Sequence, residues 1–406
     1  MPSIIILNKS TNSIFPYDQW LNTSDKELIL LNAEESVADY QDKEYLKIET
    51  FKDYNNNDEV ENRVLDLAKE HNIERLISVS EYDLVRAGRL RDQLCLQEGQ
   101  TEKSALAFRD KTVMKRIAHE GGVAVPPFQL ITSWEDINKF ILEYGYPVVL
   151  KPVDGSGAEF VNFIDNEDDL SSFKTKYKQL SSNYEIEKYI SGDLYHVDGM
   201  VLNGEIILCW SFRYIDGCSL RSRVIGSYML DINDPLKHRL VEFVTHILNV
   251  LPTSEYTPFH AEVFHTPEDK LIFCEIASRI GGGRIGEMIH QSFGINPREF
   301  WVKLQGGVPI EKTFKQKPTK YSGQIMIKSK EGRCTCLPQK KAPSWVVEST
   351  IKVQLGKVYK EAKHTMDYIA TFVVCGETVQ QVIDRLDEVK IWFENECSWE
   401  LTERNL

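Results

Sequence analysis

Short apolar runs of strand length alternate with amphipathic stretches of helix length from the first residues of the chain onward. Ser3–Leu7 is such an apolar run, Asp58–His71 repeats its apolar residues at helical spacing, and Arg75–Val79 is apolar again. This order predicts a β–α–β unit at the N-terminus. The turn after the first run is Asn8-Lys9-Ser10 instead of GxGxxG, so the dinucleotide-binding fingerprint is absent.

After a boundary at Gln97–Glu102, the same alternation continues to residue 190. Ser133 and Asp136 have capping-box spacing and predict the start of a helix that ends at Gly145. The other elements that we expect here are helices at Phe108–Glu120 and Asp168–Leu180, and strands at Val148–Lys151, Phe160–Ile164 and Tyr184–Tyr189.

The second half of the chain carries a strong hairpin signal. Two alternating runs, His196–Leu202 and Glu205–Phe212, are separated by Asn203-Gly204, the dipeptide that two-residue hairpin turns prefer. Lysine-rich Lys312–Lys320 then predicts a solvated linker, and the remaining residues predict a small mixed lobe with an amphipathic helix at Val379–Glu394. The pattern is therefore α/β throughout.

Composition excludes some classes of function. With 406 residues the chain is long enough for two to four domains. Its formal net charge of −13 argues against a nucleic-acid-binding protein, because phosphate backbones are held by clustered cations. We find no apolar run of membrane-spanning length and no signal peptide, and we expect a cytoplasmic protein that contacts no membrane.

The eight cysteines are scattered and give weak evidence for metal binding. Only Cys334 and Cys336 lie close together, and a single CxC without nearby histidines is a poor zinc signature. We expect all eight to be free thiols.

Two stretches about 110 residues apart carry the chemistry. The first, VVLKPVDGSGAE, places Lys151 at the end of an apolar strand and follows it with the glycine loop Asp154–Glu159. The second places Glu262 and Glu275 on neighbouring strand-like runs, with Arg279 and three glycines just beyond. A lysine, a loop of backbone donors, two Mg²⁺-binding carboxylates and an arginine suit phosphoryl transfer, so these residues indicate an ATP-using enzyme.

The motifs between about Leu76 and Val308 resemble the ATP-grasp superfamily of carboxylate–amine and carboxylate–thiol ligases. Within it, the chain is most similar to the bacterial L-amino acid ligases, which join two amino acids into a dipeptide. The matching elements are Arg109-Asp110-Lys111, VVLKP, DGSGAE, Glu187-Lys188-Tyr189-Ile190, YHVDG at 195–199, HAE at 260–262 and CEIASRIGGG at 274–283.

The resemblance implies an α/β ATP-grasp fold in four parts. We expect an N-terminal Rossmann-like domain at 1–100, a first ATP-grasp lobe with the glycine lid loop at 101–190, a second lobe with the Mg²⁺ and substrate site at 191–310, and a small mixed C-terminal lobe at 311–406.

The resemblance also implies the cofactors ATP and Mg²⁺, with Glu262 and Glu275 as metal ligands. A usual further ligand, an asparagine two residues after the second glutamate, is Ala277 here. The usual ribose-binding carboxylate falls at Leu194, and we substitute Asp193. The predicted ATP contacts are Lys111, Lys151, the lid residues Ser156 and Gly157, the adenine hinge Glu187, Lys188 and Ile190, and Asp193.

The predicted catalytic residues are Lys151, Arg279 and Gly282. Arg279 would bind the transferred phosphoryl group, and the backbone N–H groups of the glycines would face the substrate carboxylate or the oxyanion. The candidate substrate contacts are His196, His260, Ser278, Gly281, Gly283 and Glu287. The loops Tyr214–Tyr228 and Ser278–Met288 are expected to set specificity, with Arg221, Arg223 and Arg284 favouring an anionic group and Asp216 and Glu287 a cationic one.

The resemblance therefore implies that a carboxylate attacks MgATP and that an amine takes the acyl group from the resulting acyl phosphate. Amino acids would be the small-molecule partners, and the family habit predicts a homodimer. Three alternatives stay open: transfer to a carrier-protein thiol, transfer to a natural-product amine, and a non-catalytic ATP-binding module.

Overall fold

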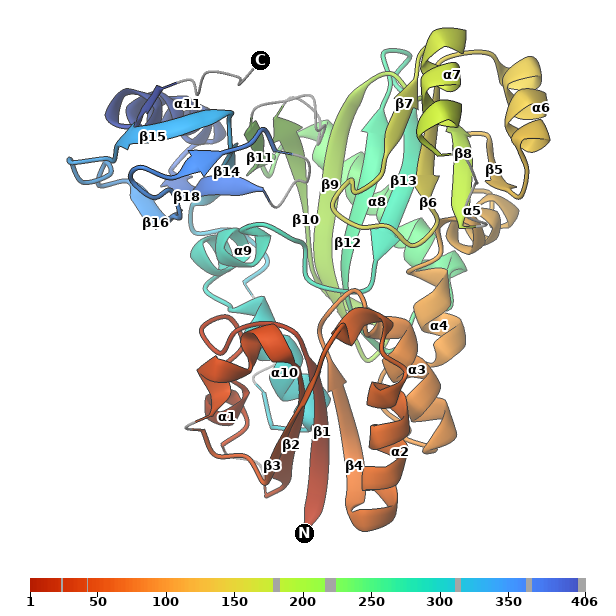
Figure 1. The fold of residues 1–406 in the computed structure, drawn as a ribbon, viewed down its shortest axis with the longest axis vertical. Helices are drawn as coiled ribbons and strands as arrows, with labels where there is room; N and C mark the ends of the chain where they lie inside the picture. The colour runs from red at the N-terminus through yellow and green to blue at the C-terminus, as the bar shows by residue number, and fades with distance from the viewer. Residues whose placement is uncertain are drawn as a thin grey trace.

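The structure is a computed structural model that describes residues 1–22, 25–41, 43–177, 183–215, 224–310, 315–362 and 367–400. Figure 1 shows an N-terminal α/β domain at one end of the molecule, and two further units side by side at the other end. In these described ranges, every helix is too short or too polar to cross a membrane.

The N-terminal domain is a parallel four-stranded sheet with helices on both faces. Its strands pair in the order β3-β2-β1-β4. Alternate residues of β1 enter two cores: Ile5 and Leu7 pack beneath α2 and α3, while Ile4 and Ile6 face the other side. The elements are β1 (Pro2–Asn8), α1 (Tyr17–Trp20), β2 (Glu27–Ala33), η1 (Glu34–Tyr40), β3 (Lys47–Phe51), η2 (Tyr54–Asn56), α2 (Glu59–Glu70), β4 (Asn72–Ser78) and α3 (Leu84–Gln93). The predicted β–α–β unit is confirmed.

A small antiparallel sheet, which we call the lid subdomain, carries the glycine loop. Its strands pair in the order β5-β8-β6-β7, and α6 and α7 contribute to its core. Ser133 and Asp136 form the predicted capping box at the start of α6. The elements are β5 (Phe128–Ile131), α6 (Trp134–Tyr144), β6 (Val148–Pro152), β7 (Asn162–Ile164), α7 (Glu167–Lys176) and β8 (Tyr184–Lys188).

Two expected boundaries in this region are corrected. The helix predicted from Phe108 is α5 (Lys111–Glu120), because the Asp110 side chain accepts hydrogen bonds from Thr112 N and Val113 N and caps it there; α4 (Glu102–Ala107) precedes it. The strand predicted from Phe160 begins only at Asn162, because Phe160 has a φ of 56° and is not extended. The helix predicted to run to Leu180 ends at Lys176, because Tyr177 leaves the helical conformation and forms its C-cap; residues 178–182 lie outside the described residues.

An eight-stranded sheet spans the rest of the molecule in the order β13-β12-β9-β10-β11-β14-β18-β16. The hairpin between β9 and β10 turns at Asn203 and Gly204, whose φ values of 53° and 77° fit the predicted two-residue turn. α8 packs on one face of the sheet, α9 on the other, and α11 against β14 and β18. The elements of the first part are β9 (Asp193–Leu202), β10 (Glu205–Ile215), β11 (Val224–Met229), α8 (Pro235–Val250), β12 (Tyr256–His265), β13 (Leu271–Ala277), α9 (Ile285–Phe293) and α10 (Pro297–Gly306).

The sheet runs on without interruption past residue 311, because β14 pairs with β11. A second small sheet, β17-β15-β19, lies beside it. The elements of this C-terminal part are β14 (Tyr321–Lys328), β15 (Gly332–Cys336), β16 (Val346–Ile351), β17 (Val358–Tyr359), β18 (Tyr368–Gly376), α11 (Val379–Glu396) and β19 (Ser398–Glu400). The seven described cysteines are free, and Cys218 lies outside the described residues.

Candidate active site

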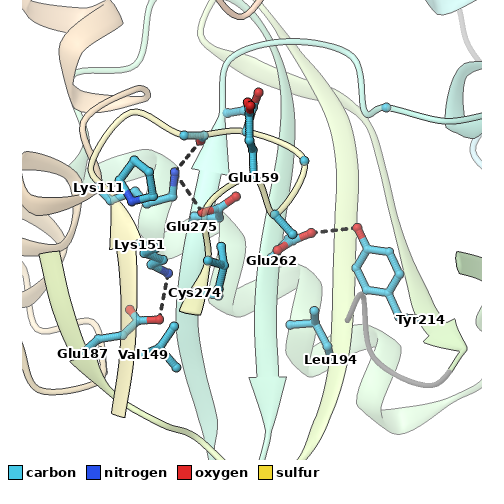
Figure 2. A pocket seen from close by; sticks show the side chains of 18 of the residues that line it. Lys111, Val149, Lys151, Glu159, Glu187, Leu194, Tyr214, Glu262, Cys274 and Glu275 are labelled. Atoms are coloured by element: carbon cyan, nitrogen blue, oxygen red, sulfur yellow. Dashed lines mark hydrogen bonds and ion pairs between the residues drawn. The ribbon is translucent and has the colours of Figure 1, made fainter. Parts of the chain in front are cut away.

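All the large units of the molecule contribute to one cavity of about 1500 Å³. The N-terminal domain, the lid subdomain, α5, the strands β12 and β13, and β14 each provide part of its wall. Figure 2 shows Lys111 and Lys151 close to Glu275, with Glu262 beside it and Tyr214 beyond.

The two predicted phosphate-binding lysines lie on this wall. Lys111, in the first turn of α5, donates to Gly155 O at 2.7 Å and lies 3.4 Å from Glu275 Oε2. Lys151, near the end of β6, has its Nζ 2.7 Å from Glu187 Oε1. Burial lowers the pKa of Lys151, but the carboxylates around it, chiefly Glu187, outweigh burial and raise the pKa well above its ordinary value. Lys151 is therefore a permanent cation.

Behind Lys151 lies a buried group of two lysines and two glutamates: Lys115, Lys151, Glu185 and Glu187. Lys115 is fully buried, lies 2.6 Å from Glu185 Oε1 and also pairs with Glu187. Lys151 contacts both glutamates as well, with Glu185 Oε1 at 3.7 Å. Two positive and two negative charges make the group neutral, as buried ions require.

The predicted metal ligands face each other across adjacent strands. Glu262 on β12 is the register partner of Glu275 on β13. Tyr214 Oη donates to Glu262 Oε1 at 2.7 Å. Burial raises the pKa of Glu275, but Lys111, Lys151 and Lys115 lower it more strongly, to about 2, so the carboxylate is ionised. Two carboxylates on one cavity wall fit Mg²⁺, which takes one or two protein carboxylates and completes its shell with phosphate and water.

A histidine–aspartate–histidine cluster adjoins Glu262. Asp198 accepts a hydrogen bond from Nδ1 of His196 through one oxygen, and from His260 Nδ1 at 3.0 Å through the other. Among the described residues, this is the one place where potential metal-ligand atoms of three His, Cys, Asp or Glu side chains lie within 4.8 Å of one another. Both Nδ1 atoms are already bonded to Asp198, so we read the cluster as a hydrogen-bonded unit and not as a metal site.

That unit holds His260 at the cavity as a cation. Burial lowers the pKa of His260, but Asp198 and Glu262 more than offset burial and raise it to about 10. His260 Nε2 lies 3.6 Å from Glu262 Oε1. Gly281 packs against the cluster so closely that a Cβ would lie 2.6 Å from Asp198 Oδ1. The charge and position of His260 thus depend on the residues behind it.

Arg279 is held in the cavity by the N-terminal domain. Its Nε pairs with Glu81 Oε2, and its guanidinium donates to Ile280 O at 3.0 Å. Glu81 Oε1 lies 3.7 Å from a second guanidinium, that of Arg109. Burial lowers the pKa of Arg279, but Glu81 beside it raises the pKa above its ordinary value. The predicted phosphoryl-binding arginine is therefore charged and oriented.

The glycine loop Asp154–Glu159 borders the same cavity. Gly157 and Ala158 have φ values of 61° and 58°, in the left-handed region that favours glycine. Ser156 Oγ lies 3.3 Å from Tyr82 Oη of the N-terminal domain. Ser156 and Gly157 both line the cavity, as a loop that closes over phosphates must.

The predicted adenine hinge is only partly placed as expected. Glu187 and Ile190 line the cavity, but Lys188 does not. Its ammonium donates to Gly145 O at 3.2 Å and Tyr146 O at 2.9 Å, on the other side of β8. The structure therefore does not bring Lys188 to the cavity with the other hinge residues, and its contact with the base stays a prediction. Asp193 lines the cavity, although its carboxylate pairs with Arg213 at 2.8 Å.

Several candidate substrate contacts do not line the cavity. Ser278 is buried and donates to Gln100 Oε1 at 2.8 Å, and His196 is buried against Phe212 with ring centroids 4.7 Å apart. Glu287 forms ion pairs with Arg284 and Arg298. Gly281 packs against Asp198 and His260 of the histidine–aspartate–histidine cluster. The structure therefore does not bring Ser278, His196, Glu287 and Gly281 to the cavity wall with the other site residues, and their substrate roles stay predictions.

Gly282, Gly283 and His260 do line the cavity, and β14 adds Gln324 and Met326. Arg284, a candidate for an anionic substrate group, instead donates to Thr371 Oγ1 at 3.0 Å and pairs with Glu287. The other specificity candidates, Asp216, Arg221 and Arg223, lie outside the described residues.

Sequence reasoning missed Lys115, Glu185 and Glu81. Lys115 follows Lys111 by one helical turn, and Glu185 precedes Glu187 by two residues on the same strand face, so spacing gave a signal for both. Glu81 had no such signal, because the first matching motif begins at Arg109 and no motif lies around Glu81.

Comparisons with known proteins found similarity in both sequence and fold. Residues 144–287 match the family model of the ATP-grasp domain. The L-arginine-specific L-amino acid ligase of Bacillus subtilis is 28% identical over 240 residues. That match spans 57% of this chain and 58% of the relative, less than two thirds of the relative's length.

Solved structures are similar over almost the whole chain. An L-amino acid ligase from Bacillus licheniformis superposes with a TM-score of 0.77 at 15% identity, covering 99% of both chains. The biotin carboxylase domain of Hydrogenobacter thermophilus 2-oxoglutarate carboxylase was solved with MgADP and bicarbonate. It superposes with a TM-score of 0.69 at 15% identity, covering 98% of this chain and 90% of that chain. The predicted fold class, an α/β ATP-grasp fold with a Rossmann-like N-terminal domain and a small C-terminal lobe, is confirmed.

Proposed function

We propose that this chain, of which residues 144–287 match the ATP-grasp domain, is an ADP-forming ligase that activates the carboxylate of an L-amino acid and joins it to the amino group of a second amino acid. The observation that carries the proposal is the convergence on one cavity of Lys111, Lys151, Glu262, Glu275 and Arg279. These side chains supply the charges that formation of an acyl phosphate needs.

In the first step, an oxygen of the substrate carboxylate attacks the γ-phosphorus of ATP, and the bond to the β-phosphate oxygen breaks. Lys111 and Lys151 hold phosphate oxygens, and Arg279 binds the transferred phosphoryl group with its guanidinium fork. Glu262 and Glu275 would hold Mg²⁺, which neutralises phosphate charge when it is bound.

In the second step, the amine of the other substrate attacks the acyl carbon, the C–N bond forms and the C–O bond to phosphate breaks. Gly282 and Gly283 line the cavity, where their backbone N–H groups would stabilise the oxyanion. The amine loses its proton to water or to a neighbouring base. No nucleophilic serine or cysteine is required, because positioning and charge neutralisation are sufficient.

The choice of amino acids as substrates is supported by the similarity to the Bacillus subtilis ligase and by the structural likeness to the Bacillus licheniformis enzyme. The superfamily includes other carboxylate ligases, so the substrate pair is part of the proposal. Mg²⁺ and ATP are supported by the family match and by the structural likeness to a domain solved with MgADP.

The test is phosphate release from MgATP with each common amino acid alone, in pairs, and with hydroxylamine as a general acceptor. We expect ADP and phosphate only when a suitable amino acid is present, a hydroxamate with hydroxylamine, and a dipeptide from a pair. Activation without a dipeptide would favour a carrier-protein thiol or another amine as the acceptor. ATP binding with no substrate-dependent hydrolysis would contradict the proposal.

A further inference from the structure

The order in which strands are added to the N-terminal parallel sheet reverses at β1, next to the cavity. From β1 the chain builds β2 and β3 on one side, and it then returns to place β4 on the other side of β1. In parallel α/β sheets, ligands bind beyond the carboxyl ends of the strands at such a switch point. Lys9 follows β1 directly, Glu81 and Tyr82 follow β4, and all three line the cavity.

Lys9 differs from the other cations of the cavity in its partners. Lys111 and Lys151 have carboxylates within 4 Å, and so have Arg279, Arg109 and Arg213. Among the described residues, Lys9 has no carboxylate within this distance. Its Nζ donates to the neutral Asn55 Oδ1 at 2.9 Å and lies 4.0 Å from the centre of the Tyr82 ring. Lys176 on α7 is another lining cation without an ion pair among the described residues, but it is exposed to solvent, whereas Lys9 is partly buried.

The surroundings of Lys9 favour a bound anion. Burial lowers the pKa of Lys9, and the more distant carboxylates of Asp83 and Glu35 offset this only in part. Half-buried cations are stabilised when an anion pairs with them. A ligand carboxylate at Lys9 would supply the anionic partner that the described residues do not place within 4 Å.

Lys9 is also connected to the predicted reaction centre. The Tyr82 ring lies under Lys9 and, at 5.7 Å, under the Arg109 guanidinium. Arg109 and Arg279 share Glu81, and the Tyr82 hydroxyl contacts Ser156 of the glycine loop. The crevice at Lys9 therefore opens on the side of the cavity where Arg279 and the loop meet.

We propose that Lys9 binds a substrate carboxylate that is not the one activated. This inference rests on the proposed function, in which Lys111, Lys151 and Arg279 are committed to phosphoryl groups. The α-carboxylate of the acceptor amino acid is the first source of such a group, and an acidic side chain on the activated amino acid is the second. The ammonium of Lys9 forms a charge-assisted hydrogen bond to either.

The test compares Lys9→Met with the wild type on acceptors that differ only in this group. Each acceptor amino acid is paired with its carboxamide, beginning with L-alanine and L-alaninamide, and hydroxylamine is the acceptor without a carboxylate. Loss of a hydrogen bond to a charged group costs about tenfold to a hundredfold in binding. We therefore expect the wild type to prefer the free amino acid by about that factor in kcat/KM, and Lys9→Met to lose the preference.

Controls separate this role from a structural one. Lys9→Arg retains the charge and should keep the preference, and Lys69→Met, at a lysine 76% exposed in the same domain, should behave as the wild type. The rate with hydroxylamine and the KM for ATP should not change in Lys9→Met. If Lys9→Met proves unstable, the comparison of Lys9→Gln with Lys9→Arg gives the same information.

An unchanged preference in Lys9→Met, or an equal loss of rate with hydroxylamine, would overturn the inference. Loss of rate confined to activated amino acids with acidic side chains would support the carboxylate site and assign it to the activated substrate. If no amino acid stimulates ADP formation by the wild type, the proposed function fails before Lys9 is tested.

Discussion

At the scale of single residues, Lys115 is a charged group that is completely buried. Its side chain has no exposed surface, and its ammonium pairs with Glu185 and Glu187, the same two glutamates that pair with Lys151. Replacing one member of a buried ion group leaves charge uncompensated, which commonly costs about 3–5 kcal/mol. Without Lys115, both glutamates would also bind Lys151 alone and hold it away from phosphate.

Lys115→Met should therefore lower the free energy of unfolding by about 3 kcal/mol. It should also weaken ADP binding while leaving adenosine binding, which needs no phosphate contact, nearly unchanged. Denaturant titration and calorimetry measure the two effects. Adding Glu185→Gln should recover part of both, and Lys139→Met, at an exposed lysine, is the control. A fully stable Lys115→Met with normal ADP affinity would contradict the neutral-group interpretation.

Glu275 and Lys151 are the residues whose charges act most directly on phosphate. Glu275→Gln and Lys151→Ala should each lower kcat by at least about a thousandfold, because both charges matter most as phosphoryl charge redistributes. Substrate-dependent phosphate release measures this, and circular dichroism checks the fold. Turnover close to wild type in either variant would remove that residue from the site.

At the scale of elements, the glycine loop between β6 and β7 is the part most suited to movement. It contacts the N-terminal domain through Ser156 and α5 through Gly155. Gly157, Ala158 and the adjoining Phe160 have backbone φ values in the left-handed region. Elements that close over ligands have few buried contacts and order on binding.

MgATP should protect residues 154–160 from hydrogen exchange, with the neighbouring strand β6 changing little. Exchange measured by mass spectrometry, with and without a non-hydrolysable ATP analogue, gives the result. Equal protection in both states would show that the loop is a static turn.

The spacing of apolar residues explains which helices, strands and site residues were placed correctly from the sequence, and which were not. Strand and helix positions followed from apolar spacing, and Glu262 and Glu275 were expected on adjacent strands, where they lie. Lys188 was expected to reach the adenine ring, with main-chain groups of Glu187 and Ile190 at the base edge. Neighbouring side chains of a strand point to opposite faces, however, and on β8 it is Glu187 that lines the cavity. Phe108 was placed in a helix because its apolar side chain fits the pattern, whereas the Asp110 cap decides where α5 begins.

At the scale of the whole molecule, the site is built from several domains, whereas hydrophobic periodicity predicts each element by itself. The pairing of β11 with β14 carries one sheet past residue 311 and brings Gln324 to the cavity. Hydrophobic alternation marks strands but does not name their partners, so this continuity was not predictable from the sequence. The four predicted domain limits and the homodimer stay predictions.

Glu81 is the clearest contact between domains in the site, because it orients Arg279 from the N-terminal domain. Glu81→Gln should lower kcat about tenfold to a hundredfold with a smaller effect on the KM for ATP, since an arginine that has lost its ion pair is less well positioned. Glu98→Gln, which removes an exposed partner of Arg75 in the same domain, is the matched control. Equal effects of the two substitutions on steady-state rates would contradict this role of Glu81.

The central claim is that a substrate carboxylate becomes an acyl phosphate in this cavity, and isotope transfer tests it most directly. An amino acid labelled with ¹⁸O in its carboxylate is incubated with MgATP and an acceptor, and the released phosphate is examined by ³¹P NMR. Because the acyl carbon–oxygen bond breaks when the amine attacks, we predict that each phosphate carries one oxygen from the carboxylate. Product formation with unlabelled phosphate would contradict the account.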